Sequence, residues 1–104
     1  MENVTRGTTP SIIYKFKTVK VSDMAVCYLT ITQASLTIEY ELSDAEVDTV
    51  NDTLTWTLTQ EDTLKIKADI RVNIQCRYRL NDGLAGASKI TTISGERILK
   101  DGEI

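Results

Sequence analysis

The sequence predicts an all-β domain, most simply an antiparallel β-sandwich, with a small β-barrel as the alternative. β-Branched residues are abundant, with 15 threonines, 11 isoleucines and 7 valines among 104 residues, and they suit a pleated, half-buried surface. Apolar and polar residues also alternate repeatedly with period two, whereas no window sustains the 3.6-residue period of a helix. No linker or internal repeat divides the chain, so residues 1–104 are predicted to form one domain.

The segment 69–80 has the clearest strand pattern. One face carries the apolar side chains, those of Ile70, Val72, Ile74, Cys76, Tyr78 and Leu80. The other face carries polar side chains, those of Arg71, Asn73, Gln75, Arg77 and Arg79. Such alternation is typical of a strand with one buried and one solvated face. A turn is predicted directly after it, at Asn81-Asp82-Gly83, because Gly83 can adopt a positive φ.

Weaker alternation predicts the remaining strands, which in chain order cover residues 11–17, 25–32, 36–42, 53–58 and 89–94. The segment 25–32 is apolar on both faces, which predicts a central strand. In the segment 89–94 the pattern leaves the register open. Trp56 is predicted to be the large core aromatic, packed near Tyr14, Phe16 and Tyr40.

The connections carry turn and cap signals. Thr59 is followed three residues later by Asp62, a pattern typical of a helix N-cap, which predicts one helical turn. Polar turns are expected at 43–46 and 50–52. The small residues of 84–88 predict a mobile loop.

Charge and composition exclude several function classes. The net charge is −3, which argues against a basic nucleic-acid binder, and no apolar run approaches the roughly 18 residues that span a bilayer. The sequence has no histidine, and we find no phosphate loop and no nucleophile motif. We therefore expect no enzymatic activity, no metal, no cofactor and no membrane partner. We also expect no secretory signal, because the first residues lack a charged region followed by an apolar stretch.

Cys27 and Cys76 are the two cysteines, and both occupy core-facing positions of predicted strands. A disulfide between facing sheets is geometrically feasible. The absence of a visible secretory signal favours two buried free thiols instead.

The arginines of the segment 69–80 form a stripe on its polar face. The first interpretation is pairing with Glu39 and Glu41 across a neighbouring strand. The second is burial in a protein interface, where arginine is enriched, and contact with nucleic acid ranks third. Glu39 and Glu41 themselves are interpreted as part of a solvated sheet face rather than as an acid–base pair. The acidic loop over 44–52 is likewise interpreted as solvated, because its spacing does not match a calcium loop.

Four phrases in order carry a resemblance to a known family. They are Arg6-Gly7-Thr8-Thr9-Pro10, then Leu58-Thr59-Gln60-Glu61-Asp62-Thr63-Leu64, then Ile74-Gln75-Cys76-Arg77-Tyr78 with Asp82-Gly83 and Ala87-Ser88, and finally Arg97-Ile98-Leu99-Lys100-Asp101-Gly102-Glu103-Ile104. As an ordered set, they resemble short proteins encoded by phages and prophages of Gram-positive bacteria. The family is similar to the immunoglobulin-like N-terminal domain of baseplate upper proteins in siphophage tails.

This resemblance implies an immunoglobulin-like β-sandwich and a non-enzymatic virion structural protein of the tail or baseplate. Such a protein is assembled in the bacterial host cytoplasm, and its partners are other phage structural proteins or further copies of itself. A small binding module, for cell-wall glycan or for a host protein that it modulates, is the alternative function.

We expect protein contacts at two terminal arms, residues 1–9 and 97–104, and at the arginine stripe; the alternative for the arms is frayed ends. The expected contact residues are Arg6, Gly7, Thr8, Thr9, Arg71, Gln75, Arg77, Arg79, Arg97, Ile98 and Ile104.

Overall fold

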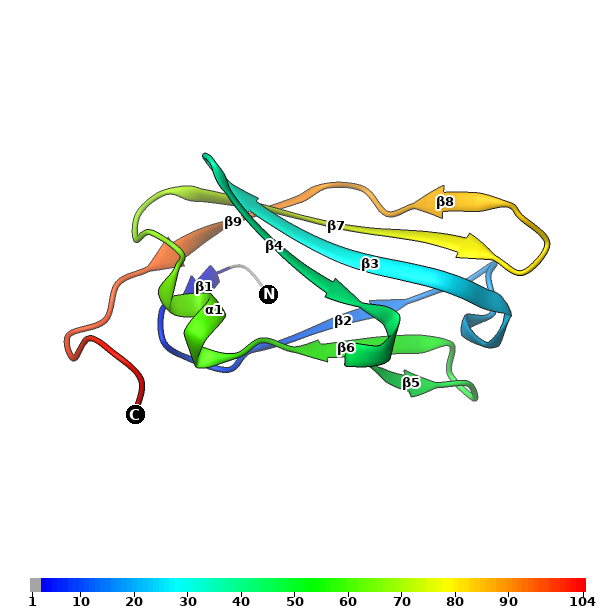
Figure 1. Cartoon of the computed structure of the whole chain (residues 1–104), viewed down its shortest axis with the longest axis horizontal. Helices are drawn as coiled ribbons and strands as arrows, with labels where there is room; N and C mark the ends of the chain where they lie inside the picture. The colour runs from blue at the N-terminus through cyan, green and yellow to red at the C-terminus, as the bar shows by residue number, and fades with distance from the viewer. Residues whose placement is uncertain (1–2) are drawn as a thin grey trace.

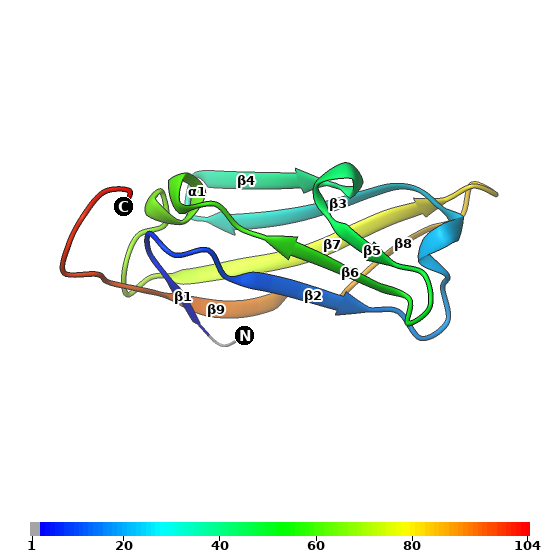
Figure 2. The same ribbon diagram turned by 90° about the horizontal axis from the view of Figure 1, so that it is seen from below.

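Two β-sheets pack face to face in the computed structural model, which describes residues 3–104 (Figure 1). In spatial order, the larger sheet contains β1 (Asn3–Thr5), β9 (Thr91–Glu96), β7 (Arg71–Leu80), β3 (Met24–Gln33) and β4 (Leu36–Glu41), and β8 (Ala85–Ala87) pairs with β7. The smaller sheet contains β2 (Ser11–Lys15), β6 (Thr53–Thr57) and β5 (Glu46–Asp48). The predicted β-sandwich is confirmed, and these sheets do not close into a barrel. Figure 2 shows the smaller sheet lying across the larger one.

β3 and β7 form the centre of the larger sheet and are its longest strands, with ten residues each. They pair antiparallel from Met24 opposite Leu80 to Thr32 opposite Asn73, with one irregularity between Met24 and Val26. The core-facing side chains of both strands are buried except those of Tyr78 and Leu80, which are partly buried, and Leu29 lies directly opposite Cys76 with neither exposed. The prediction of a central strand in this part of the chain is confirmed, since β3 lies between β7 and β4.

Trp56 on β6 is fully buried between the two sheets. Its ring meets Tyr14 edge to face, with centroids 6.2 Å apart, which confirms the predicted contact with Tyr14. Its indole N–H donates a hydrogen bond to the Glu41 carbonyl oxygen at 2.9 Å. The polar end of this large side chain is therefore satisfied inside the core.

The short helix α1 (Gln60–Leu64) follows β6 as the cap pattern predicts. The Thr59 hydroxyl accepts a hydrogen bond from the backbone N–H of Asp62 at 3.1 Å. The Tyr40 hydroxyl donates to the Asp62 carboxylate and accepts from the Thr59 N–H, which ties α1 to β4. Burial and the bond to Asp62 together raise the pKa of Tyr40 to about 12.

Three local predictions differ from the structure, at least in part. The segment 84–88 is not a loop throughout, because β8 pairs with β7 and a Cβ at Gly86 would overlap the Tyr78 hydroxyl beneath it. The predicted turn at 43–46 coincides in its first half with a 3₁₀ helix, η2 (Leu42–Asp44), but its last residue begins β5, an edge strand of the smaller sheet. Ile70 is 41% exposed rather than buried, because Asp69 has a φ of +63° and β7 begins only at Arg71.

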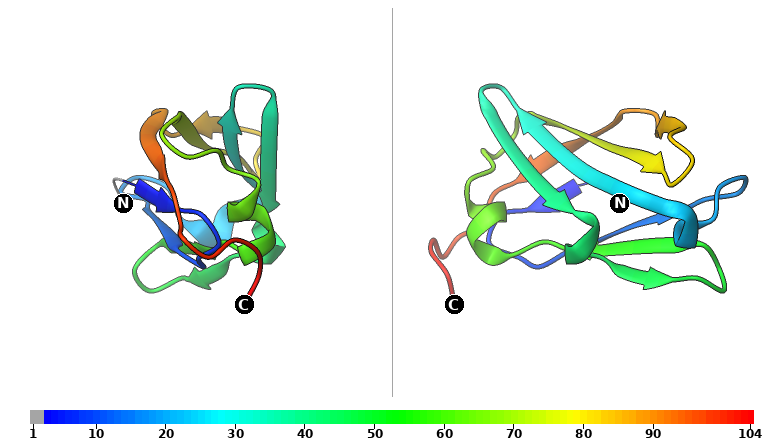
Figure 3. Two further views of the ribbon diagram at one scale, coloured as in Figure 1. Left: turned by 90° about the vertical axis from the view of Figure 1, so that its left-hand side faces the viewer. Right: turned by 45° about the vertical axis from the view of Figure 1, so that its right-hand side comes forward.

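β1 joins the larger sheet parallel to β9, with Val4 opposite Gly95. Val4 is 1% exposed, so the predicted N-terminal arm is part of the sheet from Asn3 to Thr5, whereas its residues 1 and 2 lie outside the described residues. The end-on view in Figure 3 shows β1, α1 and the C-terminal residues at one end of the sandwich.

Substituting Gly95 by alanine should destabilise the fold by about 1–3 kcal/mol, since overpacking typically costs this much. A Cβ at Gly95 would overlap the Lys67 carbonyl oxygen and lie 3.0 Å from the Ile66 side chain. Urea unfolding measures the change, and Ser94→Ala is the matched control on the exposed face of the same strand. Equal unfolding midpoints for the two variants would contradict the packing constraint.

Acid should destabilise the wild type more steeply than Asp62→Asn. Partial burial opposes ionisation of Asp62, but hydrogen bonds from Tyr40, Lys65 and Thr59 hold its pKa below the usual value. The unfolded state therefore takes up this proton at higher pH, so the stabilisation is present above about pH 4 and is lost as the pH falls further.

Thermal unfolding of both chains between about pH 6 and pH 3 tests this pH dependence. Asp23→Asn is the control, because the Asp23 side chain forms no hydrogen bond or ion pair within the described residues. Parallel pH profiles for the wild type and Asp62→Asn would contradict the prediction.

Candidate interaction surface

The outer face of the larger sheet, turned away from the smaller sheet, gathers polar side chains from β4, β3 and β7. Because the strands are in register, side chains form rows across this face. One row contains Glu41, Tyr28 and Arg77, and the next contains Glu39, Thr30 and Gln75. The arginine stripe predicted from the sequence is therefore one column of a wider mixed surface.

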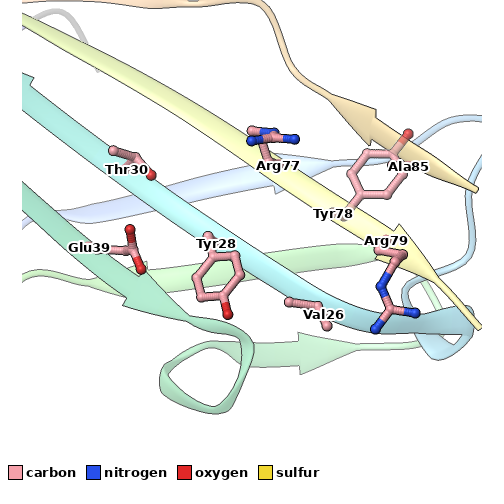
Figure 4. A pocket seen from close by; sticks show the side chains of 8 residues that line it. All are labelled: Val26, Tyr28, Thr30, Glu39, Arg77, Tyr78, Arg79 and Ala85. Carbon is pink, nitrogen blue, oxygen red and sulfur yellow. The ribbon is translucent and has the colours of Figure 1, made fainter. Parts of the chain in front are cut away.

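A groove of about 350 Å³ crosses this face, and we call it the outer groove. Its lining includes Val26, Tyr28, Thr30, Glu39, Arg77 and Arg79. Figure 4 shows Glu39 on β4 at one margin and both arginines on β7 at the other, with the β3 side chains between them. The Tyr28 side chain is 38% exposed. The groove thus combines an aromatic ring, a hydroxyl group and charges of both signs.

The predicted pairing of the arginine stripe with Glu39 and Glu41 is wrong. β3 separates β4 from β7, so these carboxylates flank β3 residues instead of arginines. Within residues 3–104 the ion pairs are Arg6–Asp101, Lys65–Asp62 and Arg97–Asp69, and none involves the stripe. Arg71, Arg77 and Arg79 are exposed, so their guanidinium groups are free to donate hydrogen bonds to the carboxylates of another molecule.

Gln75 and Asn73 lie between the arginines of the stripe, and both make contacts within the chain. The Gln75 amide donates to the Ser88 carbonyl oxygen at 3.1 Å and helps to hold the segment after β8. The Asn73 side-chain amide oxygen Oδ1 accepts a hydrogen bond from the Thr92 hydroxyl on β9 at 2.9 Å. The polar face of β7 therefore carries two kinds of side chain: arginines that project outward, and amides that form hydrogen bonds with neighbouring segments.

Arg6 lies away from the outer groove and binds α1. Its Nε donates to the Ile66 carbonyl oxygen at 2.7 Å, and its Nη2 donates to the Leu64 carbonyl oxygen at 2.9 Å. The last carbonyl groups of a helix have no partner inside the helix, so the guanidinium supplies one. Arg6 thus joins the N-terminal segment to the end of α1.

The neighbouring residues of both termini are also placed at this end. Gly7 has a φ of +71°, and a Cβ there would lie 3.2 Å from both Ile98 and Leu64. The Thr8 carbonyl accepts a hydrogen bond from the buried Thr63 hydroxyl at 2.8 Å, whereas Thr9 is exposed.

The C-terminal segment makes two further contacts within the chain. Arg97 lies 3.5 Å from the Asp69 carboxylate, and both side chains are largely exposed. The backbone of Ile104 forms two hydrogen bonds with the Gln60 side chain, at 2.8 and 3.1 Å.

Sequence reasoning missed Tyr28 and Thr30 as surface residues. The apolar residues of 25–32 predict two buried faces, but Tyr28, Thr30 and Thr32 alternate with the buried residues of β3 and lie on its outer face. This period-two polar face was the available signal. The outer groove forms because β3 lies next to β7, and the alternation of apolar and polar residues does not predict which strands are neighbours.

No protein-family model matches the chain, and no curated protein sequence matches it. Among residues 3–104, no helix is long and apolar enough to cross a membrane. Groups of three or more His, Cys, Asp or Glu side chains able to hold a metal ion are also absent from this part of the chain.

Replacing Arg6 with lysine should lower the free energy of unfolding by about 1–3 kcal/mol, because lysine cannot reach two carbonyl groups with a planar fork. Chemical denaturation provides the measurement. Arg97→Lys is the matched control and should change stability by less than about 0.5 kcal/mol, because its ion pair is exposed. If Arg6→Lys is as stable as Arg97→Lys, Arg6 does not stabilise this end of the fold.

Proposed function

We propose that this chain is a non-enzymatic structural subunit of a phage or prophage virion, located in the tail or baseplate. It acts through protein–protein contacts, and the outer face of its larger sheet is the contact surface. The observation that carries the proposal is the outer groove, where Arg77 and Arg79 lie exposed beside Tyr28 without an ion-pair partner in residues 3–104.

The side-chain chemistry supports a protein partner. Arginine and tyrosine are the residue types enriched among the residues that dominate binding at interfaces. β3 is paired with a strand on each side, so the backbone beneath the groove is already ordered. Binding a partner there therefore costs little backbone conformational entropy. A partner that places a carboxylate between Arg77 and Arg79 would form charge-assisted hydrogen bonds.

The proposal of a virion protein also rests on the ordered phrases that resemble phage and prophage proteins. We propose a non-enzymatic role because the sequence contains no histidine and no recognised nucleophile motif. The implied setting is assembly in the host cytoplasm, with other phage structural proteins or further copies of the chain as partners.

Reversing both groove charges, Arg77→Glu with Arg79→Glu, should reduce incorporation into particles at least about tenfold, because like charges would face an acidic partner. Quantitative mass spectrometry of purified particles, from a phage whose own copy of the gene is deleted, measures incorporation. Lys15→Glu with Lys17→Glu makes the same charge change on the smaller-sheet side and is the control.

Two results would overturn parts of this proposal separately. Absence of the wild-type protein from purified particles would reject a virion role. Equal incorporation of the groove and control variants would reject the outer groove as the contact surface.

The second candidate is a small binding module for cell-wall glycan or a host protein. Its supporting observation is the exposed ring of Tyr28 in the outer groove, since sugars commonly stack on exposed aromatic rings. Saturable binding of the purified chain to host cell walls, lost in Tyr28→Ala, would favour the glycan module over the virion subunit.

A further inference from the structure

Cys27 and Cys76 are adjacent in the core face of the larger sheet. Cys27 lies opposite Tyr78 and Cys76 lies opposite Leu29, so the two cysteines are diagonal neighbours on β3 and β7. Both are free and at most 1% exposed, as the sequence predicts. The expectation that a bridge between them would join facing sheets is wrong, because both strands belong to one sheet.

The two sulfur atoms are already in contact. Their Sγ atoms are 3.3 Å apart, although the residues are 49 positions apart in the chain. A disulfide requires about 2.05 Å, so the two sulfur atoms must approach each other by roughly a further 1.2 Å to bond. The hydrogen bond from Cys76 lowers the pKa of Cys27, and the same bond together with burial raises the pKa of Cys76.

A surface cavity lies beside Cys27, whereas Cys76 is not among the residues that line it. It has a volume of about 170 Å³ and is lined by Cys27 together with Ala25, Val26 and Leu42. A water molecule occupies about 30 Å³ in the liquid, so the cavity has room for a hydrogen peroxide molecule.

We propose that Cys27 and Cys76 form an oxidation site at which hydrogen peroxide converts the two thiols into a disulfide that links β3 to β7. This inference goes beyond the function proposed above and does not rest on it. It assigns a modification to the centre of the larger sheet, where the two longest strands meet.

The chemistry proceeds in two steps. The Cys27 thiolate attacks one peroxide oxygen, the O–O bond breaks, and hydroxide leaves and takes up the proton released by the thiol; the product is a sulfenic acid. Cys76 then attacks the Cys27 sulfur, the S–S bond forms, the S–O bond breaks, and water leaves. Two thiols are oxidised by two electrons in total, and one peroxide is reduced to two waters.

The experiment treats the reduced 104-residue chain with hydrogen peroxide and compares it with the same chain kept reduced. The expected product is monomeric, has lost about 2 Da, contains no free thiol after denaturation and yields a linked peptide containing both cysteines. Its thermal midpoint should rise by about 5 °C or more, and a dithiol reductant should reverse the rise. The comparison needs no variant, so it does not depend on whether a substituted core folds.

Cys27→Ser and Cys76→Ser are matched controls, and neither should show the mass loss or the thermal shift. The proposal is overturned if both thiols remain after peroxide treatment. It is equally overturned if the cysteine peptides gain only oxygen, or if the disulfide joins two separate chains.

Discussion

The antiparallel pairing of β3 with β7 determines where most other elements lie. Its inward face presents Leu29 and Cys76 to the core around Trp56, and its outward face presents Tyr28 and Arg77. β4 continues the sheet on one side, and β8 and β9 pair with β7 on the other. A slip of one residue between β3 and β7 would exchange the two faces, so the same register creates the buried core and the exposed outer groove.

The end of the sandwich at α1 is held by a different kind of interaction. There, polar side chains supply partners for backbone groups: Arg6 for the carbonyls at the end of α1, and Gln33 for the Lys67 N–H and the carbonyls of Lys67 and Ile70. Gln33 is 3% exposed, so these backbone groups are satisfied without water. Hydrophobic burial organises the middle of the molecule, and directed hydrogen bonds organise this end.

Alternation in the sequence was sufficient to predict the fold class, the buried faces of β6 and β7, and the cap of α1, because these features depend on neighbours along the chain. β8 was missed because Ala85-Gly86-Ala87 has weak strand propensity, and its pairing depends on the fit of Gly86 over Tyr78. The predicted pairing of arginine with Glu39 failed because alternation assigns faces but not strand order. The Cys27–Cys76 contact and the outer groove depend on that same order.

The parallel pairing of β1 with β9 imposes an order on folding. Asn3 pairs with Ser94 and Thr5 with Glu96, so β1 cannot pair until a strand 91 positions later in the sequence has reached it. Until then Val4 has no β9 to cover it, and the β7 edge that β9 will occupy is open. Contacts between such distant segments slow folding. The Val4 side chain therefore stays exposed to water while the rest of the larger sheet forms.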